Sequence, residues 1–134
     1  MIAVDTSVVV AGFASWHEGH ASAASVLARK PRVPAHVLIE VYSVLTRLPL
    51  PHRAPANLVV AFLAQRFGQT PLALPPRMHQ RLIEEAAAAG LAGGNIHDAL
   101  IAATARHAGV RLLTRDRRAV PTYERLGVDY QLVA

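Results

Sequence analysis

The chain of 134 residues contains no cysteine, and only Lys30 among its 14 basic residues is a lysine. Without cysteine, disulfide bonds and thiolate metal sites are excluded, and nothing indicates an oxidising compartment. No apolar run approaches the roughly 20 residues that a membrane-spanning helix needs. The N-terminus lacks the basic segment of a signal peptide, and Asp5 interrupts its first apolar run. We therefore expect a cytoplasmic protein with one domain over residues 1–134.

Acidic residues are also scarce. Nine Asp and Glu oppose 14 Lys and Arg, which gives a formal net charge of +5 and a pI near 10.7. A basic domain is attracted to polyanions, and nucleic acid is the commonest polyanion in a cytoplasm. Arginine can equally well serve solubility alone. Composition therefore leaves a nucleic-acid partner and a merely solvated basic surface equally open.

Apolar patterns typical of strands and of helices alternate along the chain. Strands, or short extended segments, are expected at residues 2–5, 31–34, 70–74, 111–114 and 129–133. Helices are expected at residues 8–13, 18–29, 36–47, 56–67, 77–89, 95–108 and 118–126. Thr6 or Ser7 is the expected cap of the first helix, and Gly109 is the expected end of the helix 95–108. The alternation predicts a three-layer α/β/α fold with a mostly parallel central sheet, whose ligands bind at the carboxyl ends of the strands.

Two acids directly follow expected strands. Asp5 ends the segment IAVD, and Asp116 ends RLLTRD, so both belong at the carboxyl edge of the sheet. Each has an ordinary alternative, Asp5 as the N-cap of the next helix and Asp116 as a turn residue or cap. The repeated placement favours a shared functional role.

Two further acids belong to expected helices. Glu40 lies at the edge of an apolar stripe, where a carboxylate loses hydration unless a cation such as Arg47 meets it. Asp98, in GGNIHDAL, is the third helical residue if Asn95 is the N-cap, and there an acid interacts favourably with the helix dipole. The helix dipole alone is enough to explain an acid at this position, but Asp98 also lies on the ligand-binding side of the expected sheet.

The four carboxylates can therefore meet at one edge of the sheet. Ionised carboxylates in a cluster repel one another, so such a cluster needs raised pKa values or bound cations. Oxygen ligands without cysteine or an evident histidine set suit Mg²⁺ or Mn²⁺, which can activate water for attack on a phosphodiester. A metal pocket beside a basic surface favours hydrolysis of a nucleic-acid backbone.

Three segments carry a resemblance to a known family: MIAVDTSVVVAGF, VPAHVLIEVYSVLTR and GGNIHDALIAATARHAGVRLLTRDRRAV. In this order and spacing they resemble the PIN-domain nucleases, and specifically the VapC-type toxins of bacterial toxin–antitoxin pairs. The resemblance covers essentially the whole chain. It implies an endoribonuclease that needs Mg²⁺ or Mn²⁺, forms a homodimer and is bound by a small VapB-like antitoxin.

The same resemblance implies roles for individual residues. The acids that match the family's metal-binding quartet are Asp5, Glu40, Asp98 and Asp116. Thr6 and Thr114 match hydroxyl positions that support the metal site. The implied reaction is in-line attack of a metal-activated water on RNA, which leaves a 5′-phosphate and a 3′-hydroxyl. The four acids would act chiefly as ligands.

Basic residues and histidines near the acids have more than one interpretation. Arg115 and Arg117 flank Asp116, and we expect them to contact RNA phosphates, although a solvated basic face is the alternative. His17 and His20 are spaced for a shared metal ion, but they lack a third ligand. Packing at the helix start is therefore the favoured role for both.

Two other protein classes with aspartates at strand ends fit the sequence less well. A phospho-receiver-like domain needs a lysine after a late strand, but Lys30 is early in the chain. A haloacid-dehalogenase-like phosphatase needs an aspartate where Ser7 stands. A PIN nuclease of RNA processing, or an RNA-binding module without cleavage, remains an alternative to the toxin.

Overall fold

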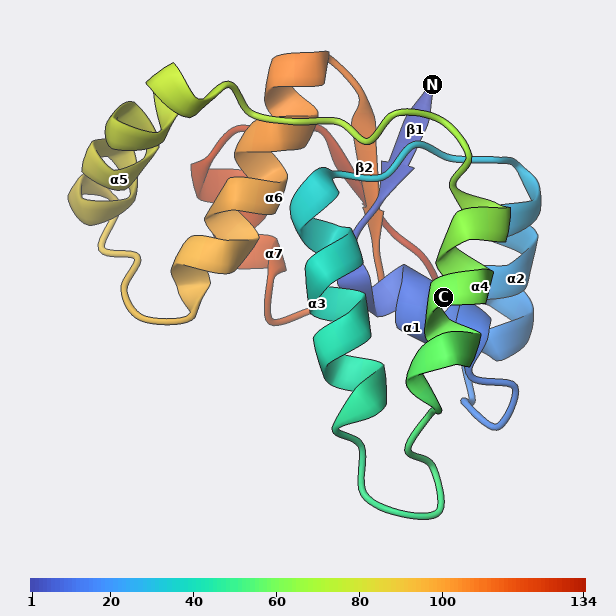
Figure 1. Cartoon of the computed structure of the whole chain (residues 1–134). Coiled ribbons are helices and arrows are strands. Elements are labelled where there is room, and N and C mark those ends of the chain that lie inside the picture. Colours follow the sequence, from blue (N-terminus) through green and yellow to red (C-terminus); the bar gives the residue numbers. More distant parts are fainter.

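A short parallel sheet lies at the centre of the computed structural model, which describes all residues, 1–134 (Figure 1). Its strands are β1 (Ile2–Val4), β2 (Arg111–Thr114) and β3 (Tyr130–Leu132). The helices are α1 (Thr6–Phe13), α2 (His20–Ala28), α3 (Ala35–Thr46), α4 (Ala56–Arg66), the 3₁₀ turn η1 (Pro76–Met78), α5 (His79–Ala88), α6 (Asn95–Ala108) and α7 (Val120–Arg125). None of these helices is long and apolar enough to cross a membrane.

All strand pairs are parallel, as expected. β1 pairs with β2, with Val4 opposite Leu113, and β2 pairs with β3, with Leu113 opposite Gln131. On the other side of β1, single bridges join Ala3 to Arg32 and Pro34 to Leu72. The first strand is therefore central, although it is the first element of the chain.

Two expected strands are reduced to these bridges. Segment 31–34 is extended and makes isolated bridges, and the strand expected at 70–74 is wrong, because only Leu72 pairs. Proline explains both outcomes, since its ring nitrogen has no hydrogen to donate to a ladder. Pro31 and Pro34 interrupt the first segment, and Pro71 adjoins the one bridging residue of the second.

The helices occur where expected, with small shifts at their ends. α1 begins at Thr6 because Asp5 is its N-cap, so the expected cap at Thr6 or Ser7 is wrong. Asn95 does not cap α6 either: Gly94 is the N-cap, without a side-chain bond, and Asn95 is the first helical residue. The helix expected at 77–89 is divided into η1 and α5. Gly109 ends α6 in the left-handed conformation (φ 69°), as expected.

Burial explains why a valine-rich segment forms α1. Val8 and Val9 are fully buried in a core of 30 residues. The helix propensity of valine is about 0.5 kcal/mol less favourable than that of alanine, whereas full burial of its side chain stabilises by roughly 1.5–3 kcal/mol. Packing therefore outweighs propensity in this helix.

Helices cover the sheet on both faces. Neighbouring residues of a strand point to opposite faces, and Leu112 and Leu113 of β2 are both buried. α1 and α6 both contact β2; α2 and α3 pack on α1, and α5 and α7 pack on α6 (Figure 1). The predicted α/β/α fold is confirmed, and it directs the start of α1 and the end of β2 to the same edge.

Candidate metal centre

Asp5 is held at the junction of β1 and α1, where its side chain is 3% exposed. Oδ1 accepts hydrogen bonds from the amides of Ser7 (3.0 Å) and Val8 (3.4 Å) and from the Ser7 hydroxyl (2.6 Å). Oδ2 accepts one bond, from the Tyr123 hydroxyl at 2.7 Å. Burial raises the pKa of Asp5, and these donors partly offset the rise. The carboxylate therefore caps α1, and Oδ2 keeps capacity for another partner.

Tyr123, beside the site, is the largest of the fully buried side chains. Burial, followed by the negative charge of Asp5, raises the pKa of the Tyr123 hydroxyl, so it stays protonated and donates to Asp5. Tyr123 was not predicted from sequence to belong to the site. Nothing in the segment PTYERL points to a partner 118 positions earlier in the chain.

Glu40 projects from α3 toward the start of α1. Its Oε1 accepts a hydrogen bond of 2.7 Å from the Thr6 hydroxyl, and 28% of its side chain is exposed. Arg47, the cation considered as a partner from sequence, donates instead to Ser43 on its own helix. Thr6 therefore orients Glu40, and no arginine neutralises its charge.

Asp98 lies in the first turn of α6 and faces the other acids. Loss of hydration raises its pKa to about 6, and the charges of Asp116, Glu40 and Asp5 add to the rise in that order. The influence of all three on one carboxyl shows that the four acids form a single electrostatic cluster. Such a cluster is stabilised by a cation.

Asp116 follows β2 and is tied to its own loop. Its Oδ1 accepts from the Arg118 amide at 2.9 Å, and its Oδ2 accepts from the Arg118 guanidinium at 3.2 Å. The Asp116 amide donates to the Thr114 hydroxyl at 3.0 Å. The Arg118 side chain is 91% exposed, so this ion pair is weak. Arg118 is also near Asp116 in sequence, but the sequence favoured Arg115 and Arg117 for phosphate contact.

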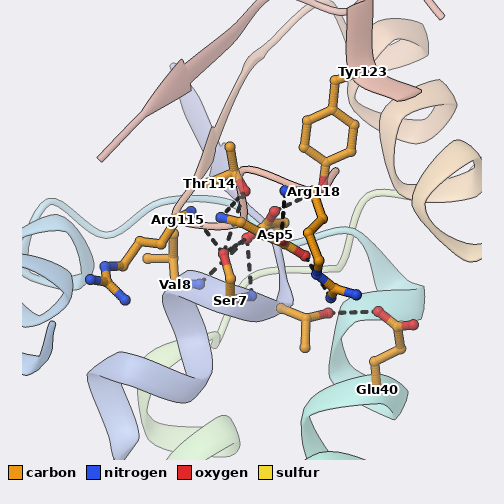
Figure 2. A network of polar contacts seen from close by, with 10 residues as sticks. Asp5, Ser7, Val8, Glu40, Thr114, Arg115, Arg118 and Tyr123 are labelled. Atoms are coloured by element: carbon orange, nitrogen blue, oxygen red, sulfur yellow. Dashed lines mark hydrogen bonds and ion pairs between the residues drawn. The ribbon is translucent and has the colours of Figure 1, made fainter. Parts of the chain in front are cut away.

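Ser7 joins the two strand ends (Figure 2). Besides donating to Asp5, its hydroxyl accepts the Arg115 amide at 2.8 Å and lies 3.4 Å from the Thr114 hydroxyl. Thr6 donates to Glu40 of α3, and Thr114 accepts from the amide of Asp116. The hydroxyls of Thr6 and Thr114 were expected near the site from sequence, whereas the link that Ser7 makes between β1 and β2 was not.

Glu40, Asp98 and Asp116 line one open cleft of about 430 Å³. Asp5 is buried and does not itself line the cleft, but its neighbours Thr6 and Ser7 do, as do Arg115 and Arg118. Arg117 is exposed and does not line it. Hollows of about 330 and 600 Å³ occur elsewhere on the surface, but none of the four acids lines them.

The histidines have local partners. His17 accepts from the Gly19 amide at 2.9 Å, and a ring nitrogen of His20 lies 2.9 Å from the Ala11 carbonyl oxygen. The two histidines therefore have different partners near the start of α2, and His17 also lines the acidic cleft. His97, next to Asp98, instead contacts His36 of α3 at 3.0 Å.

The chain matches a described protein family over nearly its whole length. The family model described as PIN domain matches residues 2–125. The chain belongs to the PIN-domain family. This PIN-domain protein is 51% identical over 133 residues to Ribonuclease VapC40 of Mycobacterium tuberculosis, with 99% of each chain covered. The expected resemblance is confirmed.

Solved structures share the fold of this PIN-domain protein. The crystal structure of Mycobacterium tuberculosis VapC20, described as a sarcin-ricin loop cleaving toxin, superposes with a TM-score of 0.69 at 23% identity, covering 90% of this chain and 94% of that one. VapBC2 from Rickettsia felis, bound to a DNA fragment from its promoter, gives 0.67 at 17% identity and 98% coverage of both chains. At these identities the likeness concerns the fold alone.

Proposed function

We propose that this PIN-domain protein is a metal-dependent endoribonuclease and the toxin of a toxin–antitoxin pair, acting as one domain over residues 1–134 in the cytoplasm. The observation that carries the proposal is the acidic cleft, in which Glu40, Asp98 and Asp116 surround one space. Loss of hydration, followed by the charges of Asp116, Glu40 and Asp5, raises the pKa of Asp98 to about 6. A self-repelling cluster of this kind is typical of a site that binds divalent cations.

The donor set fits Mg²⁺ or Mn²⁺. The proposed ligands Asp5, Glu40, Asp98 and Asp116 offer only carboxylate oxygen, which these ions prefer. Oδ2 of Asp5 has a single hydrogen-bond partner, and Arg118 on Asp116 is exposed enough to be displaced. When bound, the ion lowers the pKa of water and stabilises negative charge on a phosphoryl group.

The remaining residues position the ligands and the substrate. Thr6 orients Glu40 by donating to Oε1, and Thr114 holds the amide of Asp116. We assign Arg115 and Arg117 to the RNA backbone, Arg115 at the rim of the cleft and Arg117 on the adjoining exposed loop. Arginine is suited to this role because its planar guanidinium contacts two phosphate oxygens at once.

The relatives support the substrate and the partner. The name of VapC40 describes a ribonuclease, and VapC20 is described as cleaving the sarcin-ricin loop. The VapBC2 structure supports a VapB-like antitoxin as the partner of this protein. We further propose that the protein forms a homodimer, as its resemblance to the VapC-type toxins implies. A PIN nuclease of RNA processing is the second candidate, since it would use the same cleft.

Cleavage of total RNA tests the activity. Wild-type protein is expected to cleave RNA with Mn²⁺ or Mg²⁺ and not with EDTA, whereas Asp5→Ala and Asp98→Asn should lose cleavage by at least about a hundredfold. Asp98→Asn is included because Asp5→Ala also removes a helix cap worth about 1 kcal/mol. Asp129→Asn, which alters an exposed acid paired with Arg111, should cleave normally. Equal cleavage by all variants, or none by any with either metal, would remove the nuclease proposal.

Expression in a host cell tests the toxin role. Induction of the wild-type protein should arrest growth, and co-expression of the small reading frame adjacent to its gene should restore it. Asp98→Asn should not arrest growth. Normal growth with an actively cleaving wild-type enzyme would instead favour the RNA-processing role.

A further inference from the structure

Two histidines and a glutamate converge beside the acidic cleft. His36 and Glu40 are one turn apart on α3, and His97 comes from the first turn of α6. His36 Nε2 lies 3.0 Å from His97 Nδ1 and 3.8 Å from Glu40 Oε2, and the three ligand atoms all lie within 4.8 Å of one another. The two rings are nearly parallel, 5° apart in plane, with centroids at 5.0 Å.

These distances are close to those of a metal site. An ion with tetrahedral geometry and metal–nitrogen bonds of about 2.0–2.1 Å holds two nitrogen ligands about 3.3 Å apart. The two imidazole nitrogens are 3.0 Å apart, so a shift of a few tenths of an ångström brings them to that distance. Glu40 Oε2, 3.8 Å from His36 Nε2, needs a larger movement, of about half an ångström or more, which rotation of its side chain can supply.

We propose that His36, His97 and Oε2 of Glu40 form a second metal site, which takes a divalent ion that favours imidazole, such as Zn²⁺. Imidazole ligands suit Zn²⁺, Co²⁺ and Ni²⁺, whereas the all-carboxylate cleft suits Mg²⁺ and Mn²⁺. Three protein ligands at a partly exposed position leave room for water as a fourth ligand.

Glu40 connects this histidine site to the acidic cleft. Its Oε1 is held by Thr6 on the cleft side, and its Oε2 faces His36. One consequence rests on the proposed function: an ion at the histidine site draws Glu40 away from the cleft and lowers Mn²⁺-supported RNA cleavage. Zn²⁺ should therefore inhibit the wild-type enzyme, and this inhibition should weaken at least about tenfold in His97→Gln.

Co²⁺ titration of the intact chain without RNA tests the site directly. We expect a visible absorption band that saturates at one Co²⁺ per chain and is abolished by Zn²⁺. Affinity should fall at least about tenfold in His36→Gln and His97→Gln, because each loses a ligand. Glutamine keeps much of the bulk and hydrogen-bonding capacity, and circular dichroism checks that each variant is folded.

Two controls separate the site from its surroundings. His107→Gln changes an exposed histidine in the last turn of α6, and it should titrate like wild type. Asp98→Asn changes the cleft and should keep the band. Identical titrations of wild type, His36→Gln and His97→Gln, absence of a saturable band, or loss of the band in Asp98→Asn would overturn the proposal. Because no RNA is present, these outcomes are independent of whether the protein is a nuclease.

Discussion

Both carboxylate oxygens of Asp5 are engaged by the protein itself. Oδ1 receives three hydrogen bonds at the start of α1, and Oδ2 receives one from Tyr123. A cap and a metal ligand are often treated as alternatives for such a residue. Here the cap uses Oδ1, so Oδ2 can serve a cation without loss of the helix start.

Tyr123→Phe tests how much the buried bond to Asp5 contributes. The change leaves Oδ2 of Asp5 without its one partner in a buried position, which costs about 1–3 kcal/mol. We expect that loss in the free energy of unfolding, measured by urea denaturation in EDTA. Tyr130→Phe, at a partly exposed tyrosine 6.4 Å from the Tyr123 ring, should change stability by less than about 0.5 kcal/mol. Equal losses of unfolding free energy in Tyr123→Phe and Tyr130→Phe would show that the bond from Tyr123 to Asp5 does not stabilise the fold.

Asp98 should make the stability of the metal-free protein depend on pH. Its pKa is raised from 3.8 to about 6, so the folded state holds this proton more tightly than the unfolded state. The contribution of Asp98 to stability is therefore fully present below about pH 4 and is lost as the pH rises through 6. Asp98→Asn should melt at a higher temperature than wild type at pH 7.5 in EDTA.

The pH profile supplies the control for this prediction. The advantage of Asp98→Asn should shrink as the pH falls from 7 to 4, because the wild-type carboxyl becomes neutral. Asp129→Asn, at an exposed acid paired with Arg111, should not show this trend. A difference between Asp98→Asn and wild type that is constant from pH 4 to 8 would show that repulsion among the acids does not act on Asp98.

Helices α1 and α2 pack closely against each other at Gly12 of α1. A Cβ atom on Gly12 would overlap Cδ1 of Leu27 and lie 3.2 Å from its Cγ. Gly12→Ala gains about 1 kcal/mol of helix propensity, but overpacking a buried contact costs about 1–3 kcal/mol. We expect a net loss of roughly 1 kcal/mol, measured by thermal unfolding.

Two further variants sharpen the test at this helix contact. Gly12→Ala combined with Leu27→Val should recover much of the loss, because the shorter side chain vacates the overlapping position. Gly94→Ala, at a glycine with open space around it, should not destabilise through a clash. A single Gly12→Ala variant that is more stable than wild type would mean that α2 moves aside at little cost.

The elements themselves were largely predictable from sequence, since each depends on residues close together in the chain. The apolar periodicity located every helix, and strand-end placement pointed to Asp5 and Asp116. Helix starts were less predictable, because Thr6, Ser7 and Asp5 are all competent caps and only the geometry selects Asp5. Tyr123 and the pairing of His36 with His97 depend on contacts between distant segments, for which no local pattern exists.

Charge is distributed unevenly over the whole molecule. The acidic cleft belongs to a chain with a formal net charge of +5. Arg115 and Arg118 line that cleft, and Arg117 is exposed beside it. A substrate phosphate therefore meets positive charge around the cleft before it reaches the acids.

RNA affinity should consequently fall with salt. For single-stranded RNA, the logarithm of the binding constant should decrease linearly with the logarithm of the KCl concentration, by about 0.7 for each phosphate contact. Measured by fluorescence anisotropy with Asp98→Asn protein, which leaves the RNA intact, the added change Arg117→Ala should reduce this slope by about 0.7. Arg77→Ala, in η1 away from the cleft, should leave it unchanged. Equal slopes in all three proteins would exclude Arg117 from phosphate binding.

The central position of β1 has a consequence for the cell that makes this protein. The first strand completes its pairing only with β2, and Asp5 gains its Tyr123 partner from 118 residues further along. At a synthesis rate of roughly 5–20 residues per second, the N-terminal segment waits many seconds for these partners. A chain still attached to the ribosome therefore lacks an assembled cleft. The four acids of the cleft are therefore brought together only when synthesis of the chain is nearly finished.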